Sequence, residues 1–120
     1  MCLTIFYVED SRLVADAVSD ALEAEGWCVE VCADGNAALN KLAGAIRCDL
    51  LLLDNGLPGV SGMELARYAR KLPRYRHTPI IMLSADDVRD EARRAGVDLF
   101  LRKPDDVAGL VDAVRRLLRL

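Results

Sequence analysis

The sequence predicts an α/β protein built on a five-stranded parallel sheet with helices packed on both faces. Two observations lead to this prediction. Five short apolar runs of strand length alternate with five segments that have helical spacing or composition. Connections between parallel strands are right-handed crossovers, so this alternation permits few other architectures. A chain of 120 residues is also long enough to bury one core, and we expect a single domain over residues 1–120.

The most informative run is Leu50 to Leu53, four leucines between two aspartates. It is far shorter than the roughly 20 apolar residues of a membrane span, and it is typical of a strand buried on both faces. After Asp54 the chain continues through Asn55, glycines and a proline as far as Gly62, a composition that favours a turn. Asp54 should therefore lie at the rim of the sheet, where a loop begins.

The first half of the chain supplies two further strands and two helices. The first strand is an apolar, β-branched run that stops at Glu9 and Asp10. The helix after it repeats apolar side chains such as Leu13 and Val14 at helical spacing and stops at Gly26. We expect, in order, a strand at 3–8, a helix at 11–25, an edge strand at 27–32 and a short alanine-rich helix at 36–43.

The second half continues the alternation with three helices and two strands. Ser61 and Glu64 have the spacing of a capping box, which opens a helix that ends before Pro73. A highly charged helix with few apolar anchors should be the least rigid element. We expect, in order, a helix from 61 to 72, strand 80–83, the charged helix 86–95, strand 99–101, and a final helix that Asp105 or Asp106 caps and that carries an apolar stripe up to residue 118.

Composition excludes several classes of function. Hydrophobic residues make up 52% and charged residues 29% of the chain, as in soluble globular proteins, and the net charge is −3. No basic segment precedes the first apolar run, so we expect no signal peptide, no membrane contact and a cytoplasmic location. Aromatic residues are only 5%, which argues against nucleic-acid binding. We interpret the basic cluster as a solvated helix end and loop; it comprises Arg67, Arg70, Lys71, Arg74 and Arg76.

The chain has four cysteines, Cys2, Cys28, Cys32 and Cys48. Cys28 and Cys32 lie in one predicted strand, where four residues span about 13 Å, too far for one metal ion or one disulfide. We therefore expect small buried or edge thiols in a reducing compartment, and we assign them no function.

Ionic and polar residues follow the predicted strands at the end where parallel sheets bind ligands. They are Glu9, Asp10, Asp54, Ser84 and Lys103. Three carboxylates at one rim repel one another, and a cation relieves that repulsion. An all-oxygen ligand set with room for water and phosphate favours Mg²⁺. The lysine and the serine could then pair with a phosphoryl oxygen, so the set suits a phosphoryl group held on a carboxylate.

In this order and context, these residues resemble the receiver domain of bacterial two-component response regulators. The resemblance rests on Glu9-Asp10, Asp54 with its loop through Gly62, Ser84-Ala85, and the run from Gly96 to Pro104. It covers the whole chain and implies a flavodoxin-like (βα)5 fold, a three-layer sandwich with strand order 2-1-3-4-5.

The resemblance implies a role for each residue at the rim. Asp54 would accept a phosphoryl group from a sensor histidine kinase or a histidine phosphotransfer protein, in a phosphorelay that needs Mg²⁺. Mg²⁺ would be bound by Glu9, Asp10, Asp54 and the backbone carbonyl of Gly56. Lys103 would pair with the phosphate and would precede a cis peptide bond to Pro104. Such a domain is no enzyme beyond catalysing its own phosphorylation and dephosphorylation.

The resemblance also implies a switch. Ser84 would move to hydrogen-bond the phosphoryl oxygen, and the rotamer of Phe100 would report that move. The helix at 86–95, the fifth strand and the last helix would form a surface for a target protein, an output domain or a homodimer. Gly56 and Asp86, two residues after Asp54 and Ser84, would flank the attacking water, so we expect them to set the lifetime of the phosphoryl group.

Other functions remain alternatives. A pseudo-receiver that binds partners without phosphate is expected to lack parts of the acidic, hydroxyl and lysine set. A phosphohydrolase of the haloacid dehalogenase type needs a second acid where this chain has Gly56. No glycine-rich phosphate-binding motif follows the first strand, which argues against a nucleotide-binding fold. The sequence fits both a stand-alone receiver and a piece of a longer regulator.

Overall fold

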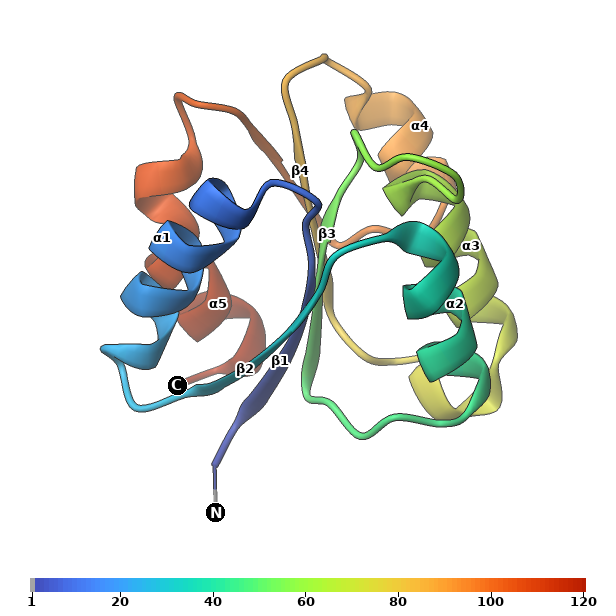
Figure 1. Cartoon of the computed structure of the whole chain (residues 1–120), viewed down its shortest axis with the longest axis horizontal. Helices are drawn as coiled ribbons and strands as arrows, with labels where there is room; N and C mark the ends of the chain where they lie inside the picture. Colours follow the sequence, from blue (N-terminus) through green and yellow to red (C-terminus); the bar gives the residue numbers. More distant parts are fainter. Residues whose placement is uncertain (1) are drawn as a thin grey trace.

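The computed structural model describes residues 2–120, which fold into three layers (Figure 1). One parallel sheet runs in the order β2-β1-β3-β4-β5. Helices α1 and α5 cover one face, and α2, α3 and α4 cover the other (Figure 1). The predicted fold class and strand order are therefore confirmed. The strands are β1 (Thr4–Val8), β2 (Cys28–Cys32), β3 (Leu50–Asp54), β4 (Ile80–Ser84) and β5 (Leu99–Arg102); the helices are α1 (Arg12–Glu23), α2 (Gly35–Ala43), α3 (Gly62–Lys71), α4 (Arg89–Arg94) and α5 (Leu110–Leu118).

The central strand β3 is buried along its whole length, as the leucine run predicts. Its alternate side chains enter two different cores. Leu51 and Leu53 pack on the side of α2, α3 and α4, whereas Leu50 and Leu52 pack on the side of α1 and α5. The parallel register pairs Val8 of β1 with Leu53, so the residues after β1 emerge beside Asp54.

The start of α3 lies directly against the end of β3. The predicted capping box is present, since the Glu64 N–H donates to Ser61 Oγ over 3.2 Å and the Ser61 N–H donates to the Glu64 carboxylate over 3.4 Å. A Cβ atom at Gly62 would lie 2.5 Å from the Asp54 carbonyl oxygen. Only glycine permits this approach, which fixes the loop that follows Asp54.

Three helical expectations need correction. Helix α4 spans only Arg89–Arg94, shorter than the predicted 86–95. The last helix begins at Leu110, after a 3₁₀ turn over Val107–Gly109, and neither predicted aspartate caps it. The Asp106 carboxylate instead accepts the Arg102 N–H over 2.8 Å, which closes the loop after β5 and delays the helix. The apolar stripe of α1 is also narrower than predicted, because Leu13 is 82% exposed.

The interpretation of Arg70 as part of a solvated helix end is wrong. Its guanidinium lies between α3, the 3₁₀ turn η1 (Pro73–Tyr75) with the loop after it, and the loop before β5. It donates to the carbonyl oxygens of Gly96, Tyr75 and Thr78 over 3.0, 2.7 and 2.7 Å, and it pairs with the Asp98 carboxylate at 2.8 Å. Helix α3 thus delivers this side chain to a group of loop carbonyl oxygens, of which that of Tyr75 also accepts the Thr78 N–H over 3.2 Å.

The expectation of four free thiols is also wrong, because Cys2 and Cys28 form a disulfide with their Cα atoms 5.9 Å apart. The register of β1 and β2 sets Thr4 opposite Cys28, so the residue two positions before Thr4 reaches the start of β2. Cys28 and Cys32 do not pair with each other, and Cys32 and Cys48 are free. Within residues 2–120, every helix is too short or too polar to cross a membrane.

Candidate functional site

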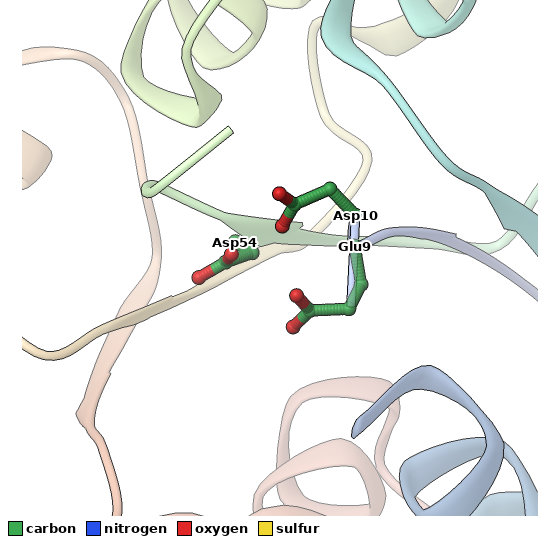
Figure 2. A group of neighbouring side chains, drawn as sticks. All are labelled: Glu9, Asp10 and Asp54. Carbon is green, nitrogen blue, oxygen red and sulfur yellow. The ribbon is translucent and has the colours of Figure 1, made fainter. Parts of the chain in front are cut away.

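Three carboxylates gather at the carboxyl end of the sheet. Glu9 and Asp10 follow β1, and Asp54 ends β3. One carboxylate oxygen from each of the three residues lies within 4.8 Å of the other two. Figure 2 shows the three side chains turned toward the same space from the two neighbouring strands. The structure thus brings together the acidic residues that the sequence predicts as a metal site.

Lys103 completes this cluster from the loop after β5. Its Nζ atom lies 2.8 Å from Asp54 Oδ1 and 3.2 Å from Glu9 Oε1. The Lys103 N–H donates to the carbonyl oxygen of Ser84 over 2.8 Å, which fixes the backbone from which the side chain extends. Burial lowers the pKa of Lys103, but hydrogen bonds and charges from Asp54 and Glu9 outweigh it, so the pKa lies above its usual value. The peptide bond to Pro104 is cis, as the resemblance implies.

Glu9 is the most buried carboxylate of the cluster, with its side chain 2% exposed. Three groups donate to it. Lys103 Nζ and the Tyr7 hydroxyl reach Oε1, and the Ser11 N–H reaches Oε2 over 3.2 Å. Burial raises the pKa of Glu9 and the Asp54 charge adds to that effect, while the Ser11 N–H and Lys103 oppose it; the pKa remains above its usual value. A cation beside it would therefore also relieve the cost of burying its charge.

The loop after Asp54 is held by its neighbours. Asn55 Oδ1 accepts the N–H of Met63 over 3.0 Å, which ties the loop to the first turn of α3. Gly56 is exposed, and a Cβ atom placed there would lie 3.7 Å from Asp54 Oδ2. Any side chain at position 56 would therefore start beside the carboxylate that the sequence predicts as the phosphoacceptor.

Of the two predicted switch residues, Ser84 lies beside the acidic cluster, whereas Phe100 does not. Ser84 is buried at the end of β4, next to Asp54 in the sheet through the pairing of Asp54 with Leu83. Its hydroxyl oxygen accepts the N–H of Asp86 over 3.1 Å, and Asp86 itself is exposed.

Phe100 is half-buried in β5 and packs against the core below α4. The guanidinium carbon of Arg89 lies 5.7 Å from the centre of its ring. The ring thus belongs to the face formed by α4 and β5 rather than to the acidic cluster.

Sequence reasoning missed Tyr7. This residue is completely buried in β1, and its hydroxyl donates to Glu9 Oε1 over 3.4 Å. Burial raises the pKa of Tyr7, and the negative charge of Glu9 raises it further, so the phenol stays protonated. The signal in the sequence is the spacing of Tyr7 and Glu9, because residues two apart in a strand point to the same side of the sheet.

The chemistry of this donor set is that of a site for a hard cation and a phosphoryl group. All three acidic groups offer carboxylate oxygens, and the described residues place no thiol or imidazole among them. The single ammonium group already contacts the carboxylate at the end of β3. A phosphoryl group on that carboxylate would extend toward the lysine and the cation site at once.

Comparisons with known proteins agree with this geometry. The family model of the response regulator receiver domain matches residues 5–115. The transcriptional regulatory protein SphR of Synechococcus elongatus, named for alkaline phosphatase synthesis, is 37% identical over 126 residues, covering 96% of this chain and 48% of SphR. The chain spans about half the length of the first curated relatives it matches.

Solved structures lead to the same family. The chemotaxis response regulator CheY4 of Vibrio cholerae superimposes with a TM-score of 0.88 at 30% identity, over 98% of this chain and 99% of that one. The receiver domain of the sensor histidine kinase PA1611 of Pseudomonas aeruginosa gives a TM-score of 0.87 at 28% identity over 100% of both chains, and it holds a magnesium ion in its active site cleft. This chain belongs to the response regulator receiver domain family.

Proposed function

We propose that Asp54 is the phosphoacceptor of this receiver domain and that its phosphorylation, with Mg²⁺ as cofactor, switches the protein. The observation that carries the proposal is the buried Asp54 carboxylate, which lies 2.8 Å from Lys103 Nζ and within 4.8 Å of oxygen atoms of Glu9 and Asp10. The lysine is placed to pair with the phosphoryl oxygens, and the acids are placed to hold the cation.

The transfer step follows from these positions. One oxygen of the Asp54 carboxylate attacks phosphorus in line, while the P–N bond of a phosphohistidine, or the P–O bond of acetyl phosphate, breaks. The imidazole or the acetate leaves with the bonding electrons. Glu9, Asp10, Asp54 and the Gly56 carbonyl would hold Mg²⁺, which when bound would supply neutralising charge for the transferred oxygens. Lys103 then exchanges part of its contact with Asp54 and Glu9 for the phosphoryl oxygens.

The proposal extends to the consequence of this step. Phosphorylation adds about −1.5 to −2 charges at one point, and Ser84, at the end of the neighbouring strand, is placed to turn its hydroxyl toward them. That move would release the Asp86 N–H from Ser84 Oγ and loosen the loop before α4, with Phe100 following. The surface formed by α4, β5 and α5 would then bind a target, an output domain or a second receiver.

The setting of this switch is part of the same proposal. The phosphoryl group would come from a sensor histidine kinase or a histidine phosphotransfer protein in the cytoplasm, within a two-component phosphorelay. The domain would catalyse only the gain and the loss of its own phosphoryl group.

Intact mass after incubation with acetyl phosphate and Mg²⁺ tests the proposal. The wild type should gain one phosphoryl group, about 80 Da, in a labile linkage, and Asp54→Asn should gain none. A control with Asp20→Asn, an exposed acid of α1 outside the cluster, should still gain the group. No adduct on the wild type, together with no stable beryllofluoride complex, would contradict the proposal and favour a pseudo-receiver that binds partners without phosphate.

Gly56 should set how long the phosphoryl group survives. Because a side chain at position 56 would begin 3.7 Å from Asp54 Oδ2, Gly56→Met should cover the path of the attacking water and slow dephosphorylation, by about tenfold if it raises that barrier by 1.4 kcal/mol. The decay of the phosphorylated mass after removal of acetyl phosphate measures this rate. The hypothesis fails if the variant and the wild type lose phosphate equally fast.

A further inference from the structure

A tyrosine hydroxyl is buried behind the acidic cluster. Tyr7 lies in the middle of β1 with no exposed surface, and its ring packs in the core on the side of α1 and α5. Among residues 2–120, the hydrogen-bond partner of its hydroxyl is Glu9 Oε1, at 3.4 Å. The buried polar end of this side chain is therefore directed at a carboxylate of the candidate metal site.

Packing alone does not account for a tyrosine at this place. The preceding residue, Phe6, is equally buried in the opposite core, and its side chain has no polar atom. A phenylalanine at position 7 would fill the same space and would avoid the cost of taking a hydroxyl group out of water. The hydroxyl is thus expected to act on the one group that it contacts.

Glu9 has two kinds of donor. Lys103 Nζ is shared, since it lies 3.2 Å from Glu9 Oε1 but 2.8 Å from Asp54 Oδ1. The Tyr7 hydroxyl and the Ser11 N–H contact Glu9 alone among the three acids. When the lysine turns part of its contact toward a phosphoryl group, these two donors still hold the Glu9 carboxylate in place.

We propose that Tyr7 is a positioning residue of the acidic site, whose hydroxyl keeps the Glu9 carboxylate turned toward Asp10 and Asp54 and thereby strengthens the binding of a divalent cation. This inference rests on the proposed function in assigning those carboxylates to Mg²⁺. It adds an outer partner to the ligand set, and such partners commonly change metal affinity by 10–100-fold.

Two matched variants test the inference. Tyr7→Phe removes only the hydroxyl beside Glu9. Tyr75→Phe removes the hydroxyl of a second buried tyrosine, which donates to the carbonyl oxygen of Ile46 over 2.6 Å and does not touch the site. Calorimetric titration with Mg²⁺ alone, on the unphosphorylated protein, gives the dissociation constant of each. We expect Tyr7→Phe to raise it about five- to tenfold and Tyr75→Phe to leave it unchanged, even though Tyr75→Phe loses thermal stability.

A second readout separates positioning from a general loss of structure. The rate at which acetyl phosphate phosphorylates Asp54, measured against Mg²⁺ concentration, should reach the wild-type maximum in Tyr7→Phe but need more Mg²⁺ to do so. A lower maximum with an unchanged Mg²⁺ requirement would overturn the inference, as would equal dissociation constants for Tyr7→Phe and the wild type.

The outcomes also distinguish this inference from the proposed function. If the wild type binds Mg²⁺ and is phosphorylated while Tyr7→Phe binds equally well, only the role of Tyr7 is refuted. If the wild type binds no Mg²⁺, the cation assignment and the role of Tyr7 fail together, and the mass test on Asp54 then decides the phosphoacceptor independently.

Discussion

Replacing Arg70 with alanine is expected to lower the free energy of unfolding by about 3 kcal/mol. The guanidinium donates to four backbone carbonyl groups, of Gly96, Tyr75, Arg76 and Thr78, and pairs with Asp98. Without the guanidinium, these carbonyl oxygens lose charge-assisted hydrogen bonds. The arginine side chain also covers them, so its removal changes how far they are exposed to water. Asp98 also accepts the first N–H of β4, so the loss reaches the strand that ends at Ser84.

Urea denaturation of three arginine variants measures this effect. Arg67→Ala is the matched control, because Arg67 lies one turn earlier on α3 and pairs with Glu91 where both side chains are 47% exposed. An exposed pair of this kind contributes at most about 1 kcal/mol. Arg70→Lys should recover little of the stability, since an ammonium group lacks the planar fork of donors that reaches these carbonyl oxygens together. Equal losses for Arg70→Ala and Arg67→Ala would contradict the role assigned to Arg70.

The contrast between these two arginines shows what periodicity can predict. Helix α3 and its ends were accessible from the sequence, because the capping box at Ser61 and the proline at position 73 act locally. The partners of Arg70 could not be predicted from the sequence. They follow the helix in the chain and come close to it only when α3, β4 and β5 assemble. A basic residue near a helix end looks the same whether its charge faces water or a set of carbonyls.

The residues of the candidate site were more predictable than their surroundings. Glu9, Asp10 and Lys103 follow strands and Asp54 ends one, and a parallel sheet places all such positions at one edge. Tyr7 was not predicted, because a tyrosine in an apolar strand is ordinarily a core residue. Only the position of Glu9, two residues later, distinguishes this tyrosine from an ordinary core residue. The late start of α5 was not predicted for a different reason. The Asp106 carboxylate accepts the Arg102 N–H instead of capping the helix.

Reduction of the disulfide between Cys2 and Cys28 should cost about 3 kcal/mol of stability. The bond closes a loop of 26 residues that contains all of α1, and in the chain-entropy model the gain comes from restricting the unfolded chain. Urea unfolding with and without dithiothreitol measures it. A Cys2→Ser, Cys28→Ser double variant should match the reduced wild type and should not respond to dithiothreitol.

Alkylation identifies the bond without unfolding the protein. After reduction under native conditions at pH 8, iodoacetamide should label two thiols, because both partners of the disulfide are exposed. Burial raises the pKa of the Cys48 thiol to about 12, so its reactive thiolate is scarce at that pH, and Cys32 is buried. Four labels, or the same unfolding curve with and without reductant, would contradict the prediction.

The compartment in which the protein works decides whether the disulfide-bonded or the reduced chain sets its stability there. In the proposed cytoplasmic setting, glutathione and thioredoxin keep exposed cysteine pairs as thiols, so the working stability would be that of the reduced chain. The disulfide lies at the start of β1 and β2, and the carboxylates lie at the other end of β1. Loss of the bond should therefore lower global stability while the Mg²⁺ dissociation constant of the double serine variant stays that of the wild type. A weaker Mg²⁺ site in that variant would mean that the bond also holds β1 in the position from which Glu9 and Asp10 reach Asp54.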